Sequence, residues 1–402
     1  MMNANMLSFD EALATLIRKA QPIREIDMAD TFVAQGRVLA ADLHSPVSVP
    51  ALDTSTMDGY ALRAADVTAP GASLLVSQRI PAGSVGHPLR PGTAARIFTG
   101  APLPPGADVV VMQEMCEHQG ETVVINHQPR AGEAVRLAGS EIARGDTVLA
   151  AGTRLRPQEL GLAASVGIAQ LPVVRRMRVA LFSTGDELVM PGEPLPPGGV
   201  YNSNRFQLRA LLLQLGCEVT DFGIVPDRLE ATRAVLRDAA QGHELILTSG
   251  GVSVGEEDHV KPAVEAEGSL DLWKIAMKPG KPLAYGRVGA AAFIGLPGNP
   301  VSSFVTFLMM VRPFILATQG ASALKPRAIA LRADFDWPRP DRRREFLRAR
   351  FNDAGGVELY AHQGAAALSS IVWADGLVDV PADTPIARGE TVRFLPYGEL
   401  LY

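Results

Sequence analysis

The sequence predicts a multidomain α/β protein, in which a central doubly wound α/β domain is accompanied by smaller β-rich parts. Between residues 175 and 325, short apolar runs alternate with helical patterns, as in parallel strands joined by right-handed helical crossovers. Residues 51–135 instead contain short β segments separated by glycine and proline, and this pattern returns after residue 326. The chain has 402 residues, enough for roughly two to four domains.

Changes in pattern along the chain indicate four parts. Proline and basic residues at Pro172–Arg178 mark a junction, and Lys325-Pro326 closes the central domain. The predicted parts are an N-terminal linker region with helical and β segments (residues 1–50 and 136–174), an inserted β-rich module (51–135), the central α/β domain (175–325) and a C-terminal β module (326–402).

Capping signals fix the start of two helices. Ser8 followed by Glu11 is a capping box, in which each side chain bonds a backbone N–H of the first turn. Asn299 with Pro300 at the first helical position begins the second helix. Pro313 lies inside that helix and should kink it, because proline lacks the N–H of a helical hydrogen bond.

Polar side chains follow four successive strands of the predicted sheet. They are Asp186 with Glu187, then Asp227, Asp258 and Asn299. Parallel strands place their carboxyl ends at one edge of a sheet, so these groups would share one cleft. Any single acid could equally be a helix cap or a solvated loop end. As a set they suit Mg²⁺, which uses one or two carboxylates beside substrate phosphate.

The loops at these strand ends carry further binding signals. Adjacent glycines after the third strand allow backbone N–H groups to approach an anion closely. The residues of the two loops that we expect to bind substrate are Ser249, Gly250, Gly251, Ser253, Pro297 and Asn299.

Basic residues follow in two groups. Lys274, Lys278 and Lys281 could be ordinary surface lysines, but the prolines and glycine around the last two restrict the backbone and favour positioned anion binding. Arg342–Arg344 with Arg348 could equally be a solvated basic edge.

Composition excludes several classes of protein. The formal charge of −5 gives no reason to expect nucleic acid as a partner, which usually requires a basic face. Cys116 and Cys217 are far apart, which suggests neither a disulfide framework nor a zinc site, and we expect both to be inert. The N-terminus has no secretory pattern, and no apolar run reaches the roughly 20 residues needed to span a membrane. We therefore expect a cytoplasmic protein that is not bound to membranes.

A serine hydrolase is a weaker alternative. Residues 251–255 match G-x-S-x-G and follow a strand, as in a nucleophile elbow. His259 is too close in sequence to return to Ser253, and His362 lies beyond the domain. Three acids in the same loop also suit a metal better than an acyl group.

Six segments together resemble one family. They are residues 55–61 (STMDGYA), 99–102 (TGAP), 183–188 (STGDEL), 248–258 (TSGGVSVGEED), 278–282 (KPGKP) and 296–300 (LPGNP). In this order along nearly the whole chain, they resemble the MoeA family of molybdopterin molybdenumtransferases, which is related to one end of gephyrin-type proteins.

The resemblance implies an elongated four-part subunit in a homodimer, whose central α/β domain binds molybdopterin in a cleft shared with the partner. The implied reaction converts adenylylated molybdopterin and molybdate to molybdenum cofactor and releases AMP in the presence of Mg²⁺. The family's functional residues fall on Asp58, Thr99, Arg136, Glu187, Asp227, Asp258, Lys274, Lys278 and Ser370.

Within this set, Glu187, Asp227 and Asp258 are the expected metal ligands. The family's molybdate pocket falls on Lys278, Lys281, Arg343 and Ser370. The C-terminal module departs from the family pattern, because Arg342 stands where glycine is frequent and Ser369-Ser370 leaves two candidate serines.

Two alternatives come from other functional classes. A molybdopterin adenylyltransferase would use a similar α/β domain, but it usually stands alone, without flanking β modules. A non-catalytic molybdopterin-binding scaffold is the other, and the intact set of acids and lysines disfavours it. For the transferase, the adenylyltransferase and recipient molybdoenzymes would be further partners.

Overall fold

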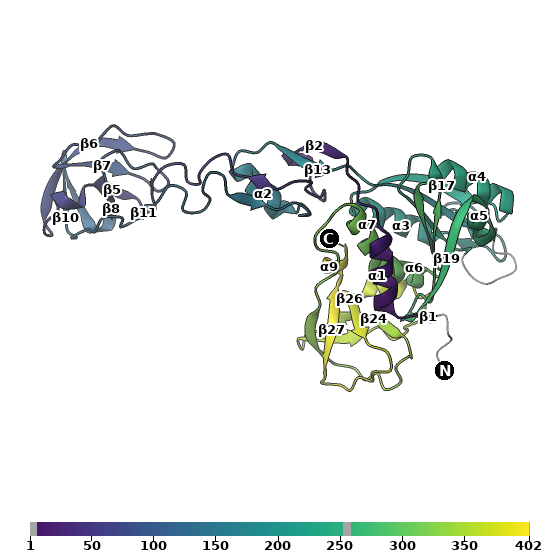
Figure 1. Cartoon of the computed structure of the whole chain (residues 1–402). Helices are drawn as coiled ribbons and strands as arrows, with labels where there is room; N and C mark the ends of the chain where they lie inside the picture. Colours follow the sequence, from purple (N-terminus) through teal and green to yellow (C-terminus); the bar gives the residue numbers. More distant parts are fainter. Residues whose placement is uncertain (1–5, 252–258, 402) are drawn as a thin grey trace.

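The computed structural model describes residues 6–251 and 259–401 and shows an elongated chain (Figure 1). The β-rich module lies at one end, and the linker region connects it to the central α/β domain. The C-terminal β module packs beside the α/β domain, near the other end. This architecture confirms the predicted multidomain α/β fold class.

The central sheet is mixed rather than fully parallel. Its seven strands, in spatial order, are β17 (Glu218–Val225), β14 (Arg178–Thr184), β18 (Leu245–Ser249), β22 (Ala291–Leu296), β21 (Pro282–Val288), β19 (Gly268–Ile275) and β1 (Met6–Leu7). The first four are parallel, as predicted, whereas β21 is antiparallel to both of its neighbours. The connection between β19 and β21 is too short for a helical crossover, which needs about a dozen residues.

The N-terminal segment belongs to this sheet and not to the linker region in which the predicted boundaries placed it. Strand β1 pairs in parallel with β19, Met6 opposite Lys274. The following helix α1 (Phe9–Lys19) begins with the predicted Ser8–Glu11 capping box. Its buried face, which includes Leu16, joins the main hydrophobic core.

Helices cover both faces of the sheet, as the doubly wound prediction requires. Helices α1, α3 (Ser203–Gln214), α6 (Pro300–Thr306) and α7 (Arg312–Thr318) enclose the larger core. Helices α4 (Leu229–Ala240) and α5 (Val260–Glu267) enclose the smaller core on the opposite face.

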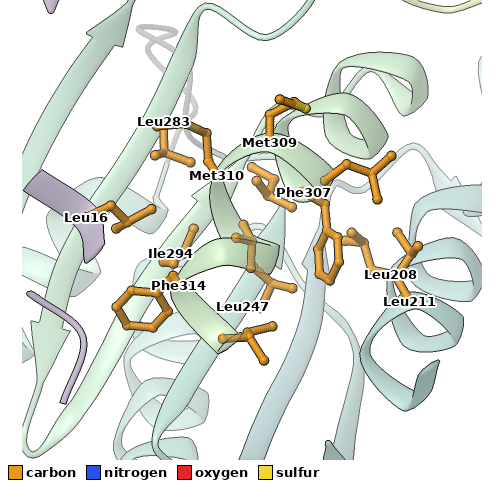
Figure 2. Packing of buried hydrophobic residues seen from close by; sticks show 14 of the residues in the cluster. Leu16, Leu208, Leu211, Leu247, Leu283, Ile294, Phe307, Met309, Met310 and Phe314 are labelled. Carbon is orange, nitrogen blue, oxygen red and sulfur yellow. The ribbon is translucent and has the colours of Figure 1, made fainter. Parts of the chain in front are cut away.

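One long helical segment, Pro300–Thr318, forms the centre of the larger core. Figure 2 shows Phe307, Met310 and Phe314 of this segment between Leu16 of α1 and Leu208 of α3. Between α6 and α7 the residues Phe307–Val311 form a π-helical turn, which accommodates the missing N–H of Pro313. Among the described residues, Pro300–Thr318 is the one helical segment long and apolar enough to cross a membrane, with a mean hydropathy of 1.6. However, 94% of this stretch is buried inside the protein.

The linker and the β-rich module are built from short strands. The linker pairs β2 (Ile26–Asp30) with β13 (Gln170–Val174), pairs β3 (Leu43–His44) with β12 (Thr147–Leu149), and contains α2 (Pro157–Ser165). The six-stranded sheet of the module has the order β8 (Val109–Met112), β5 (Gly59–Leu62), β7 (Thr93–Ile97), β6 (Ala72–Ile80), β10 (Thr122–Ile125) and β9 (Cys116–Gln119). Strands β4 (Thr54–Ser55) and β11 (Val135–Arg136) pair separately.

The C-terminal module closes into a ring of strands. Its strands are β24 (Arg344–Phe351), β25 (Gly356–Leu359), β23 (Ile329–Ala333), β27 (Thr391–Pro396) and β26 (Gly376–Val380), and β26 pairs back onto β24. Helices α8 (Ser369–Trp373) and α9 (Tyr397–Leu401) complete the module. Strand β20 (Met277–Lys278) leaves the α/β domain and pairs in parallel with β24. The two domains therefore share a backbone ladder.

Replacing Phe307 by alanine should destabilise the α/β domain by about 3 to 5 kcal/mol, because the removal of a large buried side chain would leave a cavity. Phe307 is 1% exposed. Phe206→Ala, at a position that is 52% exposed on α3, is the matched control and should cost much less. Urea unfolding followed by circular dichroism measures both, and equal losses would contradict this account of the core.

Candidate functional site

The carboxyl ends of the parallel strands bring several predicted residues together. The Asp186 carboxylate accepts a hydrogen bond from the Asp227 backbone N–H (3.1 Å), which joins the loops after β14 and β17. Gly250 after β18 lies against Gly298 after β22, since a Cβ on Gly298 would be 3.8 Å from Gly250 Cα. These loops therefore share one edge of the sheet.

Both positions after β18 require glycine, because the backbone has positive φ there and neighbouring atoms leave no room for a Cβ. Gly250 and Gly251 have φ values of +91° and +65°. A Cβ on Gly251 would lie 2.4 Å from Val260 Cγ2 and 2.7 Å from Thr184 Oγ1. The Gly250 N–H donates to Leu296 O (3.1 Å). That amide therefore holds the sheet edge, contrary to our expectation that it faces an anion.

Several buried polar atoms near this edge have no hydrogen-bond partner among the described residues. They are Ser183 Oγ, Thr184 Oγ1, Thr248 Oγ1, Asn202 Nδ2, Asn204 Oδ1, Ser303 Oγ and Thr306 Oγ1. Buried polar groups are nearly always paired with protein, water or ligand. None of these side chains is among the site residues predicted from the sequence. The sequence did contain a signal for Asn204, which stands at the start of a helix that follows a strand-end loop. In the structure its amide donates to Gly298 O (2.7 Å).

A second polar group lies where β20 meets β24. The strand register places Lys278 opposite Glu345, and Lys278 Nζ is 3.0 Å from Glu345 Oε1 and 3.5 Å from Asp341 Oδ2. Arg343 binds Asp341 through Nε (2.9 Å) and Nη2 (2.8 Å). Two of the four predicted oxyanion ligands, Lys278 and Arg343, are thus already paired with carboxylates.

Both partners of the Arg343–Asp341 pair remain charged. The hydrogen bonds from the Arg343 side chain hold the pKa of the Asp341 carboxyl far below its ordinary value. The same contact raises the pKa of Arg343. Lys281 is exposed and, within residues 6–251 and 259–401, has no ion pair, so its charge is available to a ligand.

Ser370 is buried, and Ser369 is exposed. Ser370 Oγ accepts a hydrogen bond from Arg348 Nε (3.2 Å), whereas Ser369 Oγ lies 3.0 Å from the Tyr360 hydroxyl. Arg348 is 1% exposed, so it is not part of a solvated edge. Burial lowers the pKa of its guanidinium to about 10. Arg348 therefore holds Ser370 in place inside the C-terminal module.

A third group of predicted residues lies on the distant β-rich module (Figure 1). Asp58 Oδ1 accepts hydrogen bonds from the Thr99 N–H (2.8 Å) and hydroxyl (2.9 Å), and these bonds lower the pKa of Asp58. Arg136 forms an ion pair with Glu141. Within one chain, these side chains are remote from the α/β domain.

Part of the predicted metal set is described. Glu187 and Asp227 lie at the sheet edge, whereas Asp258 and Ser253 lie outside the described residues. Among the residues that are described, no three His, Cys, Asp or Glu side chains form a metal-binding group. The donor chemistry still fits Mg²⁺, because Mg²⁺ commonly takes only one or two carboxylates and completes its shell with water and substrate phosphate.

The prediction that both cysteines are inert agrees with their surroundings. Both are free thiols. Burial raises the pKa of Cys217 to about 12 and that of Cys116 to about 11. A thiol reacts as its thiolate, so neither side chain is activated as a nucleophile.

Three family models match consecutive parts of the chain. They are the MoeA N-terminal region (domain I and II) at residues 7–167, a probable molybdopterin binding domain at 180–317, and the MoeA C-terminal region (domain IV) at 330–397. The fold and these matches define a multidomain protein built around a molybdopterin-binding type of α/β domain.

Relatives cover the chain from end to end. The molybdopterin molybdenumtransferase of Haemophilus influenzae is 37% identical and covers 98% of this chain and 100% of the relative. Molybdopterin molybdenumtransferase 2 of Mycobacterium tuberculosis is 38% identical, with 95% and 96% covered. A crystal structure of a Pyrococcus horikoshii molybdopterin biosynthesis MoeA protein superposes with a TM-score of 0.85 at 27% identity, with 98% and 100% covered. The chain belongs to the MoeA family of molybdopterin molybdenumtransferases.

Gly251→Ala should destabilise the α/β domain more than Gly242→Ala. Both glycines have positive φ, which costs other residues about 1 to 3 kcal/mol. Only Gly251 also faces atoms that a Cβ would strike, while Gly242 has nothing within 4 Å, so the excess should be about 1 kcal/mol or more. Differential scanning calorimetry compares the variants, and equal losses would contradict the close approach of Val260 and Thr184.

Proposed function

We propose that this protein inserts molybdate into adenylylated molybdopterin and releases AMP, with Mg²⁺ present. The observation that supports this most is that one helix, α6, joins the acidic edge of the sheet to the basic junction, by which we mean Lys278 and Arg343 where β20 meets β24. Val301 N, in the first turn of α6, donates to Ala365 O of the C-terminal module (3.0 Å). Gly280, between Lys278 and Lys281, packs so closely on α6 that a Cβ on it would lie 2.2 Å from Thr306 Oγ1.

Glu187 and Asp227, with Asp258, would hold Mg²⁺ through oxygen ligands. A bound Mg²⁺ supplies Lewis-acid stabilisation of the phosphoanhydride oxygens. The carboxylates of this chain would keep the ion at the strand ends, where the diphosphate of an adenylylated substrate would lie. The buried hydroxyl and amide groups of Thr184 and Asn204 offer partners for the remainder of the pterin substrate.

Molybdate would be held at the basic junction. Lys278 and Lys281 supply point charges, and Arg343 supplies a planar fork that fixes the direction of an oxyanion. Lys274 stands in the last pair of the β19–β21 ladder, opposite Pro282, and would extend the positive region toward the substrate. Ser370, held by Arg348, would be the hydroxyl ligand of the pocket. No covalent nucleophile is required, because catalysis by position and charge suffices.

The Asp58–Thr99 turn and Arg136 would reach the site from a second copy of the chain. They are too distant to join it within one chain (Figure 1). Exposed apolar side chains of the linker support an assembly: Ile26, Met28, Phe32 and Val33 are 56%, 62%, 92% and 67% exposed. Such a group of side chains is typical of an interface, and a homodimer would bury it.

The adenylyltransferase and scaffold alternatives remain less well supported. The chain retains three domains beyond the molybdopterin-binding type, and its relatives are named as molybdenumtransferases over their full length. The proposal includes a cytoplasmic location, with an adenylyltransferase supplying the substrate and molybdoenzymes receiving the product.

Glu187→Gln should reduce molybdate-dependent AMP release by about 10²-fold or more, because a metal ligand that stabilises the transition-state charge would be lost. Chromatographic detection of AMP, after incubation with adenylylated molybdopterin, Mg²⁺ and molybdate, measures this. Glu193→Gln, an exposed acid after β15 (Leu188–Val189), is the control. A wild-type protein that releases no AMP would refute the proposed reaction, and an unimpaired Glu187→Gln would refute the metal role.

Mixed dimers test the shared site. If one copy carries Asp58→Asn and the other Glu187→Gln, one of the two sites combines both defects and the other is intact. Purified mixed dimers should then regain about half of the wild-type rate, although each variant alone has lost most of its activity. Mixed dimers as inactive as the parent variants would show that the β-rich module does not act across the interface.

A further inference from the structure

The carboxylate of Asp341 occupies a set of donors that would suit an oxyanion. Oδ1 accepts hydrogen bonds from the Arg343 backbone N–H (3.1 Å) and Nε (2.9 Å), and Oδ2 accepts from Nη2 (2.8 Å). Lys278 Nζ lies 3.5 Å from Oδ2. A guanidinium fork, a backbone amide and an ammonium group around one anion are the components of a phosphate or molybdate site.

We propose that Asp341 competes with the oxyanion for Arg343 and Lys278. The Asp341 carboxylate must leave both of these side chains before molybdate binds there. This inference rests on the proposed function and deepens it, because it identifies a residue that sets the affinity for molybdate. Asp341 thereby keeps the junction neutral while no oxyanion is bound.

The charges of the cluster support this assignment. Lys278 and Arg343 contribute two positive charges, and Asp341 and Glu345 contribute two negative charges, so the cluster is neutral as it stands. A dianion gains little from a neutral cluster and is repelled by a carboxylate at the same donors. With Asp341 turned away, the cluster becomes positive, and the exposed Lys281 can add to it.

The two carboxylates are held differently, which indicates that Asp341 moves and Glu345 stays. Glu345 is 1% exposed, and its Oε2 accepts hydrogen bonds from Trp337 Nε1 and the Asp341 N–H (both 2.8 Å). The Asp341 side chain is 23% exposed, and its partners among the residues that the structure describes are Arg343 and Lys278 alone. Its backbone is anchored at both the N–H and the carbonyl, which accepts from Asp383 N (3.0 Å). Release therefore requires only a side-chain rotation.

Protonation does not supply the release at physiological pH. The Arg343 hydrogen bonds depress the pKa of Asp341, so the carboxylate keeps its charge until the pH falls far below neutral. Displacement by the incoming oxyanion is the remaining route. Asp341 would in consequence weaken the binding of every tetrahedral oxyanion at this junction.

Direct binding of sodium molybdate to the full-length protein, measured by isothermal titration calorimetry at fixed ionic strength, tests this inference without turnover. Asp341→Asn keeps the shape of the side chain and removes its charge, and it should bind molybdate about tenfold more tightly, or about 1.4 kcal/mol. Lys278→Ala in the Asp341→Asn background should abolish the gain.

Asp353→Asn is the matched control, because it removes the same charge from an exposed turn between β24 and β25. Equal gains in molybdate affinity in both Asn variants would show that the gain comes from the net charge of the protein, and this would overturn the proposal. Unchanged or weaker binding by Asp341→Asn, or no binding by any variant, would also overturn it. AMP release by the wild type, assayed separately, decides the proposed function whichever result the titration gives.

Discussion

The packing of one buried helical segment, Pro300–Thr318, is the interaction on which the rest of the structure depends. Its side chains fill the space between α1, α3 and the sheet, so it determines the position of both layers. It also reaches the C-terminal module, because Arg312 donates to Glu399 O (3.0 Å) and Phe304 packs edge-on against Tyr397. Its first turn begins at the candidate site. Hydrophobic burial in this one element therefore fixes the distance between the acidic edge and the basic junction.

Charge is distributed between the parts of the molecule rather than concentrated in one pocket. The sheet edge carries the acids, the β20–β24 junction carries the lysines and Arg343, and the β-rich module carries the Asp58–Thr99 turn. A reaction between two anions needs a place for a cation and a place for an oxyanion, held at a defined separation. The internal neutralisation by Asp341 and Glu345 also explains how basic groups can gather in an acidic protein without an anion bound.

Local signals in the sequence were sufficient for much of the fold, and long-range contacts account for what they missed. The Ser8–Glu11 capping box and the start of α6 at Asn299 depend on neighbouring residues, and both formed as predicted. The pairing of β1 with β19 joins residues far apart in the chain, so no local pattern indicates it. The burial of Arg348 depends equally on how the ring of strands closes. The pairing of Arg343 with Asp341 joins residues only two apart, but no pattern in the sequence marked it. A basic run in the sequence does not say which of its members face inward.

The central claim is that two anionic reactants meet where three parts of an assembled pair of chains come together. A crystal structure of the protein with AMP, Mg²⁺ and molybdate, with anomalous diffraction recorded at the molybdenum edge, tests this claim most directly. The account predicts a molybdenum peak beside Lys278 and Arg343, AMP at the carboxyl edge of the sheet, and the Asp58–Thr99 turn of a second chain facing both. A molybdenum peak away from this junction, with that turn remote from it, would contradict the account.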